Sequence, residues 1–310
     1  MKAIRFHEYG GPEVLRYETA PRPEPSPGEL LVRVKATAVN PVDVAIRAGY
    51  LKAMRDVEKP FILGWDFSGV VEACGKGTKK FHQGDEVFGL KQLWEQGNYA
   101  EYTVVPESVC AAKPTGLDHA TAAAIPLAGL TAWQALFDHA GLKTGQKVLI
   151  HSGAGGVGHF AIQFAKAKGI TVAATASTRN QEFLAQLGAD QPIDYTTTKF
   201  EDVVNDADAV IETKGGEIRD RSWKALKPGG ILVALIGPAP SEADAAAHQV
   251  RQTLMWVHPD PEQLTEIGNL VIAGKVKVHI DHAYPLTEIA KAHEASATGH
   301  TRGKLAILVG

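Results

Sequence analysis

Residues 147–169, KVLIHSGAGGVGHFAIQFAKAKG, constrain the fold of this chain more than any other stretch. The apolar run at 148–150 is short enough for a buried strand. Three glycines follow it in a G-x-G-x-x-G pattern: Gly153, Gly155 and Gly158. From Val157 onward apolar residues recur at helical spacing, and Gly169 is placed to end the helix. A strand, a glycine turn and a helix in this order predict a dinucleotide site at the start of the helix.

Each glycine has an expected role in such a turn. Gly153 permits the tight turn, Gly155 lets a pyrophosphate approach the backbone, and Gly158 lets the helix pack closely on the strand. The first helical residues, Gly156 and Val157, would offer backbone N–H groups and partial positive charge to the phosphates. The alternative is a tight turn in an α/β protein that binds no ligand there.

The rest of the chain divides into regions of different character, and its 310 residues suggest about two domains. Residues 1–118 predict short strands between glycine-bearing turns, which favours a barrel or sandwich; the strands are expected at 30–39, 69–73, 85–90 and 100–105. Residues 119–258 alternate strands with helices, which predicts a doubly wound parallel sheet. Residues 259–310 are too few for an independent domain and are expected to pack back on the β region.

Composition excludes several classes of function. The net charge of −3 gives no electrostatic footprint for nucleic acid. No apolar run reaches the length of a membrane span, and the N-terminal residues form no apolar leader, so a cytoplasmic location is expected. The two cysteines, Cys74 and Cys110, cannot build a disulfide framework and are expected to be buried thiols.

The residues after the second strand of the alternating region bear on cofactor choice. Enzymes that use NAD usually carry an acidic residue there to hold the ribose 2′-hydroxyl. This chain has Ser177, Thr178, Arg179 and Asn180 instead. Arg179 and Ser177 could both hydrogen-bond a 2′-phosphate, so NADP(H) is expected. The alternative is that 177–180 only cap the next helix.

Several segments together resemble the medium-chain dehydrogenase/reductase superfamily, and within it the zinc-independent quinone oxidoreductase branch. They are MKAIRFHEYGGPEVL at 1–15, NPVD at 40–43, GWDFSG at 64–69, GDEVFGL at 84–90, LAGLTAW at 127–133, SGAGGVG at 152–158 and GHTRGKLAILV at 299–309. The resemblance covers essentially the whole chain. It implies a GroES-like catalytic domain at 1–118, a Rossmann NADP-binding domain at 119–258, and a segment at 259–310 that returns to the catalytic domain. It also implies an active site in the cleft between the domains, and a homodimer that meets along the Rossmann sheets.

The departures from the superfamily concern zinc. Its alcohol dehydrogenases use a cysteine and a Gly-His-Glu motif as catalytic zinc ligands, whereas this chain has Asn40-Pro41-Val42-Asp43 and Gly64-Trp65-Asp66 at those places. The four-cysteine structural lobe is also missing. We therefore expect no metal, and substrates that accept hydride without a Lewis acid: quinones or α,β-unsaturated carbonyls. The resemblance implies an NADPH-dependent reductase; the alternative is an NADPH-binding protein of crystallin type with little turnover.

The resemblance also implies catalytic roles. Asn40 is expected at the mouth of the cleft, holding ribose or a substrate oxygen, although an Asx turn before Pro41 is an alternative. Thr131 is expected to face the nicotinamide, unless it bonds back to its own helix. Tyr50 is expected to donate a proton or hydrogen bond to substrate oxygen, unless it only fills the cleft.

Other positions are implied to contact the cofactor. They are Tyr195 near the adenosine end, Thr213, Leu235 and Ile236 at strand ends, and Gly303 and Lys304 near the nicotinamide. For Tyr195 a simple loop aromatic is the alternative. Asp43 is expected to be structural. Asp66 is expected to be a buried carboxylate, which requires a partner such as Arg302 or Lys304.

Overall fold

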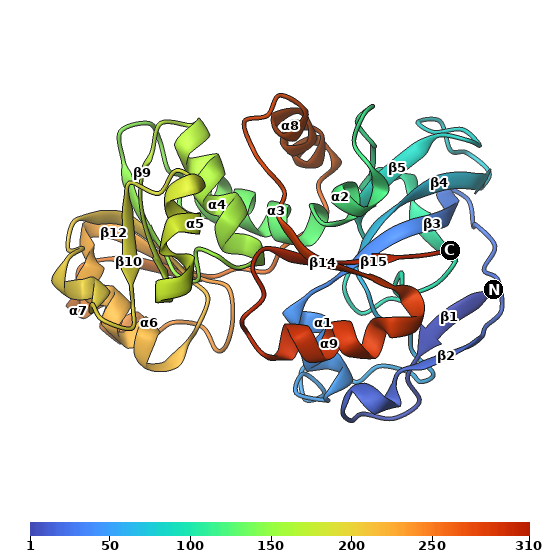
Figure 1. The fold of residues 1–310 in the computed structure, drawn as a ribbon, viewed down its shortest axis with the longest axis horizontal. Coiled ribbons are helices and arrows are strands. Elements are labelled where there is room, and N and C mark those ends of the chain that lie inside the picture. The colour runs from blue at the N-terminus through green and yellow to red at the C-terminus, as the bar shows by residue number, and fades with distance from the viewer. The chain divides into compact units, whose positions relative to one another are not determined.

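The computed structural model describes residues 1–310, which form two compact units (Figure 1). The first comprises Met1–Leu130, His258–Ala273 and Val278–Gly310, and the second comprises Thr131–Val257 and Gly274–Lys277. The division after Leu130 comes later than the boundary expected at 118. Helix α2 (His119–Ala123) belongs to the first unit because it packs on strands of that unit through its buried alanines.

The first unit is built on a sheet in the order β14-β15-β3-β4-β5-β7, with β6 also pairing with β3. Its strands are β3 (Glu29–Val39), β4 (Asp66–Cys74), β5 (Glu86–Leu90), β6 (Tyr102–Pro106), β7 (Cys110–Ala112), β14 (Ile280–Pro285) and β15 (Lys304–Leu308). A separate pair is formed by β1 (Lys2–Arg5) and β2 (Arg16–Thr19). Its helices, besides α2, are α1 (Pro41–Arg47), α8 (Pro261–Ile272) and α9 (Ile289–Ala297). This is the GroES-like architecture.

Strand β3 organises this sheet. Its apolar residues are largely buried, and it pairs antiparallel with β4, β6 and β15. The pairing with β15, which sets Leu305 opposite Val39, ties the end of the chain to the first unit. Strand β14 begins at Ile280 and pairs in parallel with β15. Helix α1 was not expected.

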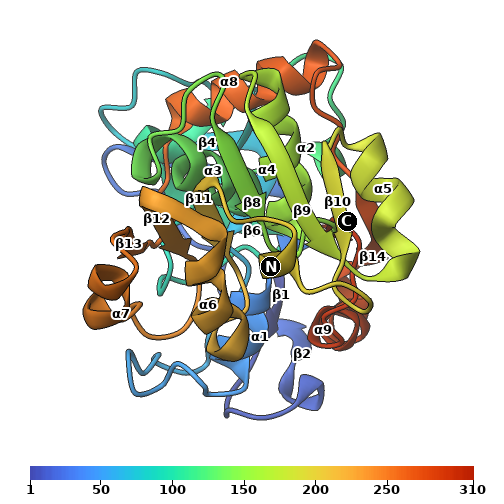
Figure 2. The ribbon, with the colours of Figure 1, turned by 90° about the vertical axis from the view of Figure 1, so that its left-hand side faces the viewer.

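The second unit is a Rossmann-type parallel sheet in the order β10-β9-β8-β11-β12-β13 (Figure 2). Its strands are β8 (Lys147–Ile150), β9 (Thr171–Ala176), β10 (Gln191–Asp194), β11 (Ala207–Glu212), β12 (Leu226–Ala234) and β13 (Arg251–Leu254). Its helices are α4 (Gly156–Ala167), α5 (Gln181–Gln186), α6 (Gly216–Ser222) and α7 (Glu242–Ala247). Helix α3 (Pro126–Trp133) spans the division between the units.

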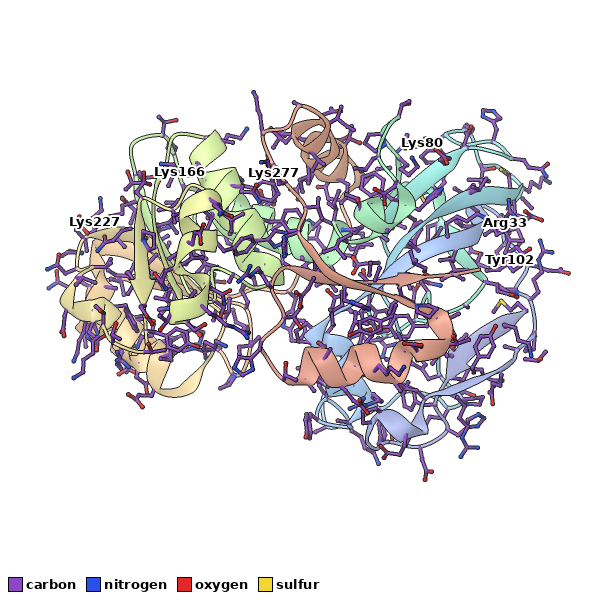
Figure 3. All side chains as sticks on the ribbon, in the orientation of Figure 1. Arg33, Lys80, Tyr102, Lys166, Lys227 and Lys277 are labelled. Carbon is purple, nitrogen blue, oxygen red and sulfur yellow. The ribbon has the colours of Figure 1, made fainter.

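The core of this sheet is apolar and its rim is charged. Leu149, Val210 and Leu232 are completely buried on adjacent strands. Lysines lie on the outside of the unit, where Figure 3 labels Lys166 and Lys227. Lys166 pairs with Asp190 at 2.7 Å. Strands buried on both faces explain the continuous apolar runs that predicted them.

Only one of the two cysteines is buried as expected. Cys110 on β7 is fully buried, and burial raises the pKa of its thiol to about 12. Cys74, at the end of β4, is exposed, so the expectation that both would be buried was wrong for this residue. Its strand ends there, where the chain enters the turn at Gly75, and no further element covers the side chain.

Candidate functional site

The glycine turn between β8 and α4 is the first component of the site. Its left-handed residue is Ser152, with φ +55°. Gly153 has no positive φ; its role is instead one of packing, because a Cβ there would lie 2.8 Å from Leu184 Cδ2 and 3.0 Å from Ala174 Cβ. The expectation that Gly153 permits the tight turn is therefore corrected to a requirement for small size.

The other two glycines differ: Gly158 is required for packing, whereas Gly155 occupies an open position. A Cβ on Gly158 would overlap the carbonyl oxygen of Ser152 and lie 2.7 Å from Gly153 Cα, so the helix can approach the turn only without a side chain. A Cβ on Gly155 would meet only Ser152, with its oxygen at 3.3 Å, and otherwise projects into open space.

Free backbone donors surround this open position. Gly155 is the N-cap of α4, and no side chain caps the helix. The first N–H groups of a helix, here those of Gly156, Val157 and Gly158, have no intrahelical acceptor. A concave backbone with unpaired N–H groups at the positive end of a helix fits a pyrophosphate. The residues present therefore fit the dinucleotide that the sequence predicted.

Neighbouring strand ends support this turn. Thr213, after β11, donates to Ser152 Oγ at 2.9 Å and so lies beside the turn. The backbone near Leu235 and Ile236, after β12, is held by an ion pair that sequence reasoning missed. Arg219 Nε donates to buried Glu212 at 2.8 Å, and the same guanidinium donates to the Ile236 carbonyl.

The ion pair explains how the loop after β12 is kept in place. Glu212 also accepts Gly215 N at 2.6 Å, and Arg219 donates to Pro238 O at 2.6 Å. Charge-assisted hydrogen bonds with both partners buried are strong, and a multiply bonded guanidinium fixes several carbonyls at once. In the sequence, the only indication of this ion pair is an acid at the end of a buried strand, Glu212, seven positions before Arg219 on the next helix.

Three predicted residues meet at the ends of β9 and β10. Ser177 follows β9, and Arg179 is exposed on the turn Thr178–Asn180. Tyr195 N donates to Ala176 O at 3.2 Å, which joins the end of β10 to that of β9. The Tyr195 side chain is 54% exposed, and Ser177 makes no helix-capping bond.

A carboxylate that sequence reasoning did not weigh also lies at this edge. Asp194, the last residue of β10, stands opposite Ala176 in the parallel register. Hydrogen bonds from the side chains of Thr178 and Thr196 lower the pKa of Asp194, so the group is ionised at neutral pH. The edge therefore carries both a guanidinium and a carboxylate.

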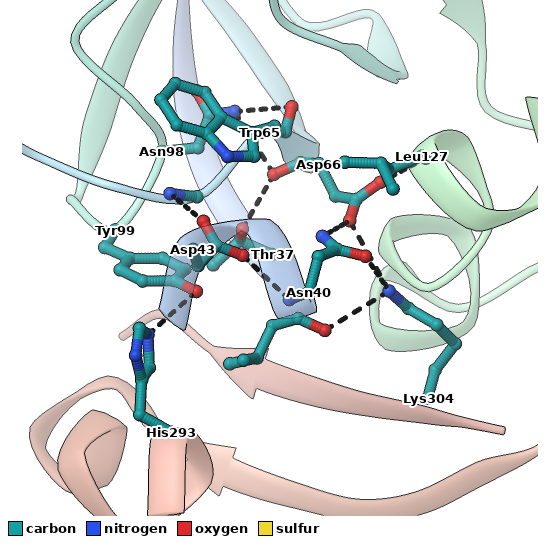
Figure 4. A network of polar contacts seen from close by, with 12 residues as sticks. Thr37, Asn40, Asp43, Trp65, Asp66, Asn98, Tyr99, Leu127, His293 and Lys304 are labelled. Atoms are coloured by element: carbon teal, nitrogen blue, oxygen red, sulfur yellow. Dashed lines mark hydrogen bonds and ion pairs between the residues drawn. The ribbon is translucent and has the colours of Figure 1, made fainter. Parts of the chain in front are cut away.

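The first unit contains a buried polar network around Asp66 (Figure 4). Asp66 Oδ2 accepts Asn40 Nδ2 at 2.7 Å, and Oδ1 accepts the backbone N–H of Leu127 at 2.6 Å. Lys304 Nζ lies 3.8 Å from Asp66 and donates to Asn40 Oδ1. Burial raises the pKa of Asp66 and lowers that of Lys304, while each charge favours the other. The expected partner of Asp66 is thus Lys304.

This network defines the surroundings of Asn40. The residue is 1% exposed, and its side-chain amide joins Asp66 to Lys304 rather than forming an Asx turn. Its backbone N–H donates to Asp43 Oδ2 at 2.7 Å, and Asp43 also accepts Gly64 N at 2.9 Å. Burial raises the pKa of Asp43 to about 7, and its bonds to backbone agree with a structural role. The role of Asn40 toward ribose or substrate stays a prediction.

The remaining predicted residues have contrasting environments. Tyr50 is 81% exposed after α1, and its hydroxyl makes no hydrogen bond within the chain. Thr131 is buried on α3. Gly303 has φ +67°, and a Cβ there would overlap His279 O, so the turn before β15 requires glycine. Lys304 is committed to the Asp66 network, and its expected contact with a cofactor is untested.

No three histidine, cysteine, aspartate or glutamate side chains anywhere in the chain are grouped so that they could hold a metal ion. None of the helices has the length and apolar character needed to cross a bilayer.

Comparison with known proteins gives matches over the whole chain. Residues 26–115 match the family described as alcohol dehydrogenase GroES-like domain, and residues 187–307 match that described as zinc-binding dehydrogenase. A chloroplast envelope quinone oxidoreductase homolog of Arabidopsis thaliana is 34% identical, with 99% of this chain and 98% of the relative covered. An NADPH-dependent alkenal/one oxidoreductase of the same plant is 36% identical, with 99% and 79% covered. The structure of a quinone oxidoreductase from Coxiella burnetii superposes with a TM-score of 0.93 at 38% identity, covering 100% of this chain and 99% of the other.

Proposed function

The chain belongs to the medium-chain dehydrogenase/reductase superfamily and is an oxidoreductase, and from this premise we propose that it reduces quinones or α,β-unsaturated carbonyls with NADPH and without zinc. The names of two relatives, a quinone oxidoreductase homolog and an alkenal/one oxidoreductase, support these two acceptor classes. The donor set supports the absence of zinc, because no thiolate or imidazole group is assembled to bind it.

The second unit supplies the residues that would hold the cofactor. Bound NADPH supplies a hydride, which is chemistry of the nicotinamide and not of the protein. The N–H groups at the start of α4 would bind the pyrophosphate across Gly155, with Thr213 fixing Ser152 beside them. Arg179 and Ser177 would hold the 2′-phosphate, which favours NADPH over NADH.

Arrival of a hydride leaves negative charge on the acceptor oxygen, and a positioned donor can stabilise it. Tyr50 is our candidate, because its hydroxyl is exposed and makes no hydrogen bond within the chain. Thr131 and Asn40 are proposed to position the nicotinamide and the acceptor. The protein would then contribute orientation and one proton or hydrogen bond.

The open position at Gly155 is the observation that carries this proposal, since the fold leaves it without a packing reason to be glycine. The test measures NADPH oxidation by the purified chain with benzoquinone, 2-hexenal and cyclohexenone, each with and without a chelator. We expect steady turnover with at least one acceptor, unchanged by the chelator and strongly reduced in Gly155→Val when NADPH is limiting. NADPH binding with no turnover on any acceptor would refute the reductase and favour the crystallin-type alternative.

We also propose a homodimer that meets along the Rossmann sheets. Strand β13 supports this, because it is the last strand of its sheet and its outer edge pairs with no strand of this chain. An open sheet edge is a template for pairing with another chain. Sedimentation equilibrium should give twice the chain mass, and a monomer at micromolar concentration would contradict the proposal.

A further inference from the structure

The first unit contains a cavity of about 300 Å³ whose walls all belong to that unit. Its size lies at the lower end of the range of small-molecule sites, roughly 300–1,000 Å³. The walls are largely apolar and include Pro21, Pro60, Ile62 and the ring of Tyr102, which Figure 3 labels. None of the lining residues carries a carboxylate.

Lys91 is the unusual residue of this cavity. It is 7% exposed, and the only hydrogen bond of its ammonium goes to Thr103 Oγ1, at 3.3 Å. Glu95 and Glu29 act on Lys91 only at a distance, because neither forms an ion pair with it. An ammonium has three N–H donors, so two are left without an acceptor from the chain.

Other lysines with buried side chains show how this chain normally neutralises them. Lys113 lies 3.1 Å from Glu86, and Lys304 lies 3.8 Å from Asp66. Burying an unpaired charge is costly, and buried charges are ordinarily paired. Burial lowers the pKa of Lys91 to about 8, so most molecules still carry the ammonium at neutral pH. Lys91 therefore carries a positive charge that an anion in the cavity would balance.

The second basic residue of the wall does not compete for such an anion. Arg5 lines the cavity, but its guanidinium pairs with Glu18 at 3.0 Å. The ring of Tyr102 is held from outside by the guanidinium of Arg22, 4.1 Å from its centroid. Met1 also lines the cavity, and its N-terminal ammonium donates to Ala20 O at 2.9 Å. The cavity thus combines the unpaired ammonium of Lys91 with a largely apolar wall.

We propose that this cavity binds a small amphipathic monocarboxylate, with its carboxylate on Lys91 Nζ and Thr103 Oγ1 and its apolar part against Pro21, Pro60 and Ile62. Both polar groups come from neighbouring positions of the first unit, on the residue after β5 and on β6. The proposal is independent of the hydride chemistry and of the cofactor.

The test titrates hexanoate into the whole chain by calorimetry, with hexanamide as the uncharged probe of the same shape. Hexanoate should bind saturably, and at least about ten-fold more tightly than hexanamide, since a charge-assisted hydrogen bond is lost. Lys91→Met keeps most of the apolar stem of the side chain without its charge and should weaken hexanoate by about the same factor. Lys227→Met, which removes an exposed lysine of the second unit, is the matched control and should bind as the wild type does.

A second variant tests the cavity and not the charge. Val104→Phe would fill the space from β6 while leaving Lys91 in place, and should also abolish saturable binding. The urea midpoint, measured for every variant, reports whether the fold is kept. No saturable binding by the wild type, equal binding of hexanamide, or unchanged binding in Lys91→Met or Val104→Phe would each overturn the proposal.

Discussion

Replacement of the glycines in the β8–α4 turn tests whether this turn binds phosphate. Gly155 and Gly158 lie one helical turn apart in the same motif, yet the fold constrains them differently. The pair therefore allows the effect on cofactor binding to be separated from the effect on stability.

The geometry gives a magnitude for each change. Gly155 has φ −82° and ψ −177°, an extended conformation that valine also adopts. Its Cβ would meet only Ser152, with a tight 3.3 Å approach to the backbone oxygen, so Gly155→Val should cost the N-cap preference for glycine, about 1 kcal/mol, and a small shift of that oxygen. The added side chain would stand between the backbone N–H groups and the pyrophosphate. The loss of two charge-assisted hydrogen bonds, about 1.5 kcal/mol each, would raise the Kd for NADPH by about 100-fold.

Gly158→Ala should instead lower the stability of the fold more than it lowers NADPH binding. Its Cβ would overlap Ser152 O, a backbone atom that can move only if the turn moves, so we expect overpacking of about 1–3 kcal/mol or more. Urea midpoints and calorimetric Kd values for NADPH measure the two effects. Gly155→Val binding NADPH as tightly as the wild type would show that this turn is not the phosphate site. An undiminished urea midpoint in Gly158→Ala would contradict the packing role.

Further predictions concern the cofactor edge, the proton donor, zinc and a buried histidine. Arg179→Ala should weaken NADPH binding about ten-fold or more and leave NADH binding little changed, whereas equal losses would remove the 2′-phosphate assignment. Asp194→Asn should not weaken NADPH binding. A loss of NADH binding in Asp194→Asn would indicate that this carboxylate holds a ribose. Tyr50→Phe should lower kcat more for 2-hexenal than for a quinone, because general acid assistance is typically worth about 10²–10⁴ in rate, with the Kd for NADPH unmoved; equal rates on both acceptors would leave proton delivery to solvent. Elemental analysis of protein purified without chelator should find no stoichiometric zinc, and one tightly held zinc whose removal abolishes activity would falsify the zinc-free proposal. Burial lowers the pKa of His151 to about 3, while the unfolded chain binds a proton below about 6.5, so the stabilisation is complete above that pH and is lost as pH falls. Between about pH 6.5 and 5, His151 should lower the free energy of unfolding by on the order of 2 kcal/mol, which is measured as a fall in the urea midpoint. His151→Gln should make the urea midpoint depend less on pH over this range.

The sequence predicted the local elements well where a period was long enough to detect. The strand and helix around the glycine turn lie within a residue of the expected ranges, because burial on the sheet imposes the same pattern that was used to find them. Strand β10 was not predicted because only Ile193 of its four residues is buried, so it shows no apolar run as β8 does. Helix α1 was not predicted because seven residues show too little of a helical period. The left-handed Ser152 could not be predicted, because a non-glycine residue takes a positive φ only where the surrounding structure enforces it.

Contacts between distant positions were predictable only where chemistry demanded them. A buried carboxylate requires a partner, and this rule led from Asp66 to Lys304 across most of the chain. The same rule applied to Lys91 would have failed, because no carboxylate pairs with it and the residues that line its cavity, among them Pro21, Pro60 and Tyr102, are distant in the sequence. A lone lysine after a strand carries no signal that it will be enclosed.

The Asp66 network joins residues 40–43 and 64–66, the two segments that the resemblance sets at the zinc-ligand places of the alcohol dehydrogenases. Both carboxylate oxygens of Asp66 already accept hydrogen bonds, from Asn40 and from Leu127 N, and Lys304 supplies a cation beside them. Leu127 lies in the first turn of α3, the helix that carries Thr131. The network therefore ties that helix to β4, α1 and β15 through one carboxylate. Because removing one partner of a buried pair leaves the other uncompensated, Lys304→Met should leave the Asp66 carboxylate without its cation and lower the urea midpoint of the chain.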